Sequence, residues 1–275
     1  MITIKDLVFY YKRERPVLND ISIKIENGVY GLLGENGAGK SSLLHLISGL
    51  LFPKSGTCKI NGYESSLRHP EMMAQLFFLP DESRIPMTSI RDFAKRHSAF
   101  YSNFNLEIFE ENLDDFKING YKRMTELSLG QKKKAIISYV LALNTPVILM
   151  DEPTNGLDIT SKDILKKMIA RTISDDQCLI ISTHQVYDFE NLLDAVIILG
   201  QHKVLLNSTM EEITNKLVFT QTEAEPQNAL YSKQTVQGYS SVLINDYSKE
   251  STVNIDLLYK TVLKNDGIIE DLFNL

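Results

Sequence analysis

One eight-residue stretch limits the possible folds more than any other part of this 275-residue chain. Residues 34–41, GENGAGKS, fit the pattern Gly-x4-Gly-Lys-Ser, with the apolar run VYGLL before them and the helical pattern LLHLISGL after them. A glycine-rich loop lets backbone N–H groups surround a phosphate without a Cβ in the way, and a helix N-terminus adds partial positive charge. The stretch therefore predicts a strand–loop–helix unit that binds a nucleotide phosphate.

Two side chains of this unit have the chemistry for specific roles. The Lys40 ammonium can reach the β- and γ-phosphates, and the Ser41 hydroxyl can ligate Mg²⁺. The predicted nucleotide contacts in and directly after the loop are Gly34, Asn36, Gly37, Ala38, Gly39, Lys40, Ser41 and Ser42.

A second segment places carboxylates at the end of a buried strand. The apolar run VILM, residues 147–150, leads into Asp151-Glu152-Pro153. Beside a phosphate loop, Asp151 can hold Mg²⁺ through water. Glu152 is then placed to activate a water molecule for in-line attack on a phosphate.

The stretch TELSLGQKKKA carries a helix start. Ser128 and Gln131 stand three residues apart before an apolar helical pattern, which predicts a capping box. Three lysines, residues 132–134, follow in the first turn, where positive charge opposes the helix dipole. We therefore expect an anion to belong at this helix N-terminus.

Apolar strands alternate with helical patterns along most of the chain, which predicts an α/β fold with a mainly parallel sheet. Alternating strands near the N-terminus indicate an added antiparallel β region, and residues from about 85 to 143 a helical lobe. We expect one large domain over residues 1–207. Residues 208–275 read as a small α+β appendage, with SVLIND as a strand and Asn254 as the cap of a helix.

Composition excludes several classes of protein. The net charge of −6 and pI of about 5.5 argue against an overall basic surface for nucleic acid. The longest apolar region, AIISYVLALNTPVILM, is interrupted at residues 144–146 and predicts a helix, a turn and a buried strand rather than a membrane span. The N-terminus has no signal-peptide pattern. Cys58 and Cys178 lie in strand-like runs without a CxxC motif, so we expect two reduced, buried thiols.

In its order of motifs the chain resembles the ATP-binding cassette (ABC) ATPases over about residues 1–205. The order is GENGAGKS, a helical lobe, LSLGQ, VILMDEP, TNGLD and STH. The resemblance implies that Tyr11 stacks on adenine, with Tyr10 as the alternative, that Asp151 orients the metal, and that Glu152 is the general base. It also implies that His184 contacts the γ-phosphate and that Asp158 lies at a partner subunit.

In this family two cassettes pair head to tail, so the resemblance identifies the expected anion. Ser128, the Gly130 backbone and Gln131 would meet ATP bound by the phosphate loop of the partner cassette.

Two positions depart from the family pattern. Leu129 stands where the family usually has glycine, which would be strained if the backbone there were left-handed and tolerable if it were helical. Asp81, followed by Glu82, stands where the family usually has a glutamine that ligates Mg²⁺. Asp81 is thus either a third metal ligand or only a loop residue.

The resemblance implies an ATP-hydrolysing subunit that binds ATP and Mg²⁺, forms a homodimer and docks on a separate permease at the inner face of the cell membrane. The single cassette with an appendage resembles the ATPases of ABC-2-type exporters. The alternatives are a soluble non-transport ABC ATPase, such as the iron–sulfur assembly type, and a regulatory cassette with little turnover.

Overall fold

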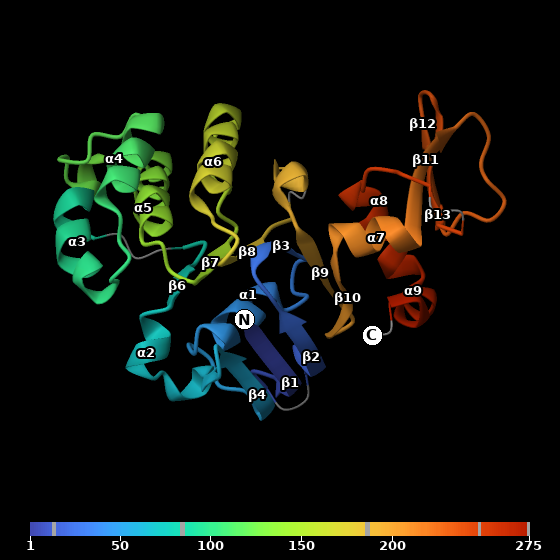
Figure 1. Cartoon of the computed structure of the whole chain (residues 1–275), viewed down its shortest axis with the longest axis horizontal. Coiled ribbons are helices and arrows are strands. Elements are labelled where there is room, and N and C mark those ends of the chain that lie inside the picture. Colours follow the sequence, from blue (N-terminus) through green and yellow to red (C-terminus); the bar gives the residue numbers. More distant parts are fainter. Residues whose placement is uncertain (13–14, 83–85, 185–187, 247–248, 274–275) are drawn as a thin grey trace.

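The computed structural model describes residues 1–12, 15–82, 86–184, 188–246 and 249–273. Its largest sheet has six strands in the order β10-β9-β3-β8-β7-β6 (Figure 1). These strands are β3 (Gly28–Leu33), β6 (Leu76–Leu79), β7 (Val147–Asp151), β8 (Cys178–Ser182), β9 (Ala195–Gly200) and β10 (Lys203–Thr209).

Five of the six strands run parallel, because β9, β3, β8, β7 and β6 pair in parallel and only β10 is antiparallel to its neighbour. Residues along these strands alternate between two cores. Val147 and Leu149 of β7 face one core, and Ile148 and Met150 face the other. The predicted α/β fold with a mainly parallel, doubly covered sheet is confirmed.

A second, antiparallel sheet covers one face of the first, with the order β2-β1-β4-β5. Its strands are β1 (Ile2–Phe9), β2 (Leu18–Ile25), β4 (Ser55–Ile60) and β5 (Tyr63–Glu64). Asn61 and Gly62, both with positive φ, turn the chain from β4 into β5 as the Asn-Gly pair predicts. Helix α1 (Lys40–Ile47) packs between the two sheets and is followed by Gly49 at φ +70°.

Helices cover the other face, and those between residues 85 and 143 form the predicted lobe (Figure 1). They are α3 (Ile90–His97), α4 (Leu106–Asp115), α5 (Leu129–Ala142) and α6 (Ile159–Thr172), and the short α2 (Pro70–Met73) precedes β6. Four of these helices begin at residues whose side chains accept a backbone N–H, namely Ser89, Asn105, Ser128 and Asp158. The lobe packs around the buried ring of Tyr139, which contacts four phenylalanine rings.

The apolar region from residue 135 to residue 150 is helix, turn and strand, as predicted, since α5 ends at Ala142 and β7 begins at Val147. Within the described ranges, no helix combines the length and the apolar character needed to cross a membrane.

The C-terminal part contains more β-structure than its sequence indicates. It comprises α7 (Met210–Lys216), β11 (Leu217–Thr222), β12 (Tyr231–Thr235), β13 (Gly238–Ile244), α8 (Ile255–Lys264) and α9 (Asp266–Phe273). The expected strand is β13, and Asn254 caps α8 by accepting the Leu257 N–H. Strands β11 and β12, which flank β13, are not among the expected strands: β12 lies in a polar stretch, and β11 begins with the apolar run LVF just before that stretch. The Glu190 carboxylate accepts the Ile255 N–H and joins α8 to the segment that precedes β9.

Both cysteines are free and buried, at 1% and 0% exposure, as predicted. Burial raises the pKa of Cys58 to about 11 and that of Cys178 to about 12.

Because the thiolate is the reactive form, we expect neither thiol of the folded protein to react with Ellman's reagent at pH 8, and both to react in guanidinium chloride. Rapid reaction of the native protein would contradict this packing.

Candidate nucleotide-binding site

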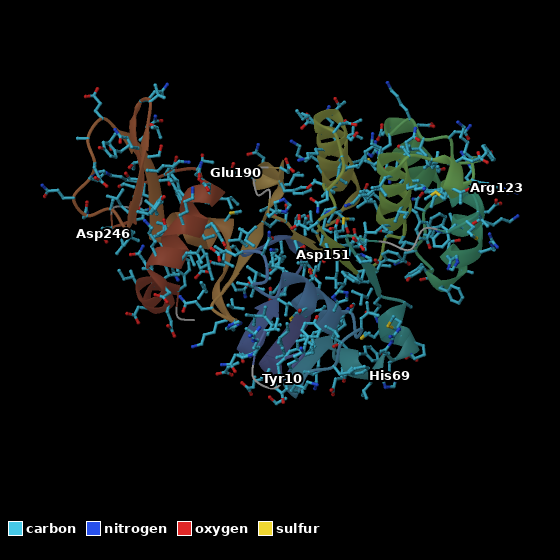
Figure 2. The ribbon with its side chains drawn as sticks, turned by 180° about the vertical axis from the view of Figure 1, so that it is seen from behind. Tyr10, His69, Arg123, Asp151, Glu190 and Asp246 are labelled. Carbon is cyan, nitrogen blue, oxygen red and sulfur yellow. The ribbon has the colours of Figure 1, made fainter. Side chains whose placement is uncertain are left out.

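Three neighbouring parallel strands bring the predicted catalytic segments to one edge of the main sheet. The phosphate loop follows β3, Glu152 follows β7, and His184 follows β8. Asp151 lies near the centre of the molecule (Figure 2). A cleft of about 500 Å³ opens at this edge, and it is lined by Tyr11, Val17, Asn36, Gly37, Gly39, Lys40, Ser41, Ser42, Asp81, Asp151, Glu152, Asn155 and His184.

The phosphate loop depends on its glycines. Gly39 has φ +102°, and a Cβ there would lie 2.9 Å from Leu18 Cδ2. A Cβ on Gly34 would lie 2.8 Å from the Leu199 carbonyl oxygen, so this residue packs tightly against β9, next to Ala38. Gly37 has φ +86° and open space around it, which leaves its backbone accessible from the cleft.

The Lys40 side chain folds back over the loop. Its ammonium donates to the carbonyl oxygens of Gly34 at 2.8 Å and Glu35 at 3.2 Å. The residue is only 7% exposed, and burial lowers its pKa, whereas the nearby Glu152 and Asp151 carboxylates oppose that shift. Lys40 is thus a buried cation that faces two carboxylates across the cleft.

The two carboxylates are fixed by β8. Asp151 accepts a hydrogen bond from the Ser182 hydroxyl, and the Glu152 N–H donates to the Ser182 carbonyl at 3.0 Å. Glu152 Oε2 lies 2.9 Å from His184 Nδ1. Glu152 has φ +46°, in the left-handed region that most side chains avoid.

The two candidate adenine-stacking tyrosines lie in different surroundings. The Tyr11 side chain lines the cleft, is 65% exposed, and its hydroxyl is 3.2 Å from the Ser42 hydroxyl. The Tyr10 ring instead lies under Lys54, and Figure 2 labels it at the outer edge of the molecule. The geometry therefore favours Tyr11 over Tyr10.

The predicted capping box is present at the start of α5. The Gln131 N–H donates to Ser128 Oγ at 3.3 Å, and the Ser128 N–H donates to Gln131 Oε1 at 3.0 Å. Leu129 is the first helical residue and lacks positive φ, so its side chain causes no backbone strain. Ser128, Gly130 and Gln131 are not among the residues that line the cleft of the same chain.

Asp81 is held in a way that the sequence did not reveal. Its carboxylate accepts hydrogen bonds from Lys133 Nζ at 3.2 Å and from Asn155 Nδ2 at 3.2 and 3.3 Å. In the sequence, the features that could have indicated Lys133 and Asn155 as partners of Asp81 are the run of three lysines and the Asn-Gly pair after Pro153.

The comparisons with known proteins identify the family. The family model described as "ABC transporter" matches residues 18–155, half of the chain. The chain belongs to the ABC transporter family. The predicted resemblance is confirmed, and the nucleotide is ATP, since members of this family are ATP-binding proteins. The chain is an ATPase.

Individual relatives are about 30% identical to this chain over the aligned residues. It is 29% identical to the ABC transporter ATP-binding protein YtrB of Bacillus subtilis over 74% of this chain and 70% of the relative. It is 31% identical to the energy-coupling factor transporter ATP-binding protein EcfA2 of Ligilactobacillus salivarius over 77% and 80%. A solved structure of the ATP-binding subunit of an ABC transporter has the same fold, with a TM-score of 0.70 at 24% identity over 78% of this chain and 91% of that one.

The residues of this ABC protein fit a magnesium ion that is bound together with a nucleotide. Among the described residues, no cluster of three or more His, Cys, Asp or Glu side chains could hold a metal ion. Ser41 and Asp151 line the same cleft and offer one hydroxyl and one carboxylate. Mg²⁺ is commonly held by one or two such ligands, substrate phosphates and water, which matches this sparse donor set.

We expect Lys40→Ala to raise the Kd for ATP by about 10- to 100-fold, because each charge-assisted hydrogen bond to phosphate contributes about 1.5–3 kcal/mol. Calorimetric titration checks this. Lys54→Ala is the matched control: it removes a lysine that lies over the Tyr10 ring, outside the cleft, and should leave the Kd unchanged. Tight ATP binding by folded Lys40→Ala protein would contradict the placement of the phosphates.

Proposed function

We propose that this chain is the subunit that uses ATP-driven dimer closure to power a separate membrane permease. One observation carries the proposal: a single cleft contains a phosphate loop with its buried Lys40, a fixed Asp151 and a Glu152–His184 pair. These are the groups needed to bind a nucleoside triphosphate, to hold its metal and to activate water.

Each group has a proposed role in hydrolysis. Lys40 and the loop N–H groups bind the β- and γ-phosphates, and Tyr11 stacks on adenine. Ser41 and Asp151 hold Mg²⁺, which would neutralise charge on the phosphate oxygens. Asp81 stays a predicted third ligand, since it lines the same cleft.

Glu152 is proposed as the general base. Its carboxylate accepts a proton from the attacking water while the bond from that oxygen to the γ-phosphorus forms and the bond to the ADP oxygen breaks. His184 Nδ1 lies 2.9 Å from Glu152 Oε2, and His184 lines the cleft. We propose that His184 orients this carboxylate and contacts the γ-phosphate.

The start of α5 is proposed to complete the site of a second copy. Ser128 and Leu129 are exposed, and the neighbouring Ile159 at the start of α6 is 81% exposed. An exposed helix N-terminus that already satisfies its own cap can still offer N–H groups and dipole to a phosphate on another molecule. ATP would thereby hold two copies together, and hydrolysis would release them.

We propose export as the direction of transport and residues 208–275 as an accessory unit after the cassette. The names of the relatives, which are ATP-binding proteins of transporters, support a function of this chain as part of a transporter. Co-expression with a membrane protein from a neighbouring reading frame tests the assignment: the pair should co-purify in detergent, and the complex should move its cargo out of the cell in an ATP-dependent way.

A regulatory cassette with little turnover is the alternative that the site argues against. The departure at Leu129 causes no strain, and Glu152 is present and held beside His184. A soluble ABC ATPase of the iron–sulfur assembly type would bind and hydrolyse ATP equally well but would not co-purify with a permease.

We expect Glu152→Gln to keep ATP binding and to lose turnover by about 10²–10⁴-fold, because the amide cannot accept the proton. ATP should then trap the protein as a dimer, visible by multi-angle light scattering. The double variant Lys40→Ala/Glu152→Gln is the control and should stay monomeric. Near-normal hydrolysis by Glu152→Gln would exclude Glu152 as the base.

Ser128→Arg tests the composite site. If Ser128 only caps α5, Ser128→Ala costs about 1 kcal/mol of stability and leaves turnover nearly intact. If Ser128 meets the partner's ATP, Ser128→Arg should bind ATP normally but lose closure and hydrolysis. A mixture of Ser128→Arg with Lys40→Ala contains dimers in which one composite site is whole, so closure should return. Wild-type hydrolysis by folded Ser128→Arg would contradict the composite site.

A further inference from the structure

One lysine of helix α5 is directed into its own subunit rather than toward a partner. Lys133, the fifth residue of α5, donates from Nζ to the Glu152 carbonyl oxygen at 2.7 Å and to Asp81 Oδ1 at 3.2 Å. Its side chain is only 14% exposed. The ammonium thus lies between the helical lobe, the loop after β6 and the residue proposed as the general base.

Asn155 closes this arrangement from the loop after β7. Its amide donates to both oxygens of the Asp81 carboxylate, at 3.2 and 3.3 Å. Asp81, which is 41% exposed, therefore meets one cation and one amide while it also lines the ATP cleft. The neighbouring Lys134 turns elsewhere, to Asp158 at 3.3 Å and to the Phe116 ring.

The charges around the cleft explain why a second cation matters there. The lining includes three carboxylates, on Asp81, Asp151 and Glu152, but one lysine, Lys40, among the described residues. ATP is a polyanion, so an uncompensated carboxylate at the cleft opposes its binding. Lys133 is the cation that offsets Asp81, because its Nζ lies 3.2 Å from the carboxylate.

Lys133 also holds the backbone of Glu152, through the carbonyl oxygen of that residue. At φ +46° this residue has a strained conformation that its surroundings must maintain. Ser182 accepts its N–H, and Lys133 donates to its carbonyl, so the peptide groups on both sides of the Glu152 Cα are held.

We propose that Lys133 is a positioning residue of the ATPase, which neutralises Asp81 beside the bound nucleotide and fixes the backbone of Glu152. This inference rests on the proposed roles of Glu152 and the cleft. It differs from an ordinary surface ion pair, which contributes little and whose loss would leave nucleotide affinity unchanged.

A double-mutant cycle separates the two tasks. The variants are Lys133→Gln, Asp81→Asn and both together, and Lys132→Gln is the matched control. Lys132 precedes Lys133 on the same helix, makes no ion pair with any residue in the described ranges, and does not line the cleft. A fluorescent ATP analogue gives the Kd, first in EDTA to measure charge alone and then in Mg²⁺, and steady-state assays give kcat.

In EDTA we expect Lys133→Gln to raise the Kd about tenfold, because the Asp81 charge is then uncompensated. Asp81→Asn should bind at least as tightly as the wild type, and the double variant should return to within about threefold of it. The kcat should fall in Lys133→Gln and stay low in the double variant, since both lack the hold on the Glu152 carbonyl. Lys132→Gln should keep the wild-type Kd.

Circular dichroism and a thermal melt establish that each variant is folded, and Lys133→Arg, which retains the charge, should keep the wild-type Kd even if Lys133→Gln does not fold. A folded Lys133→Gln protein with wild-type Kd and kcat would overturn the inference. So would equal losses of affinity in both single variants without recovery in the double. Wild-type protein that neither binds nor hydrolyses ATP would instead overturn the proposed function.

Discussion

The pairing of three parallel strands decides where the chemistry of this protein lies. Backbone hydrogen bonds place β8 between β3 and β7, in a register that sets Ser182 beside both Leu32 and Asp151. The phosphate loop follows β3, Asp151 ends β7 with Glu152 directly after it, and His184 follows β8, so these groups meet at one edge of the sheet. A shift of one residue in either pairing would turn alternate side chains to the opposite face. The cleft depends on this register more than on any single side-chain contact.

Features coded by a few adjacent residues could be predicted from the sequence. The turn at Asn61-Gly62, the cap at Asn254 and the capping box at Ser128 each depend on residues within four positions of one another. The parallel sheet followed from its continuous apolar strands, because a strand buried on both faces needs no polar alternation.

The features that could not be predicted from the sequence depend on contacts between distant segments or on exposed strands. Strand β12 is mostly polar, with every residue partly or fully exposed and no alternation that would predict a strand, and only its pairing with β13 makes it one. The choice between Tyr10 and Tyr11 required the position of Ser42, 31 residues away from Tyr11. The contact of Lys133 with Asp81 spans 52 residues, and the sequence alone suggested that the lysine run met an anion on a partner. The roles of the site residues stay predictions that the proposed variants test.

The left-handed backbone at Glu152 has a consequence for how this protein can change. Glycine adopts φ +46° without strain, whereas a long side chain such as that of glutamate is disfavoured there. At position 152, glycine would therefore fit the backbone best, whereas the proposed chemistry requires glutamate. In a related protein that no longer needs to hydrolyse ATP, replacement of this glutamate by glycine could increase stability. A glycine at this position would then indicate a cassette without catalytic activity.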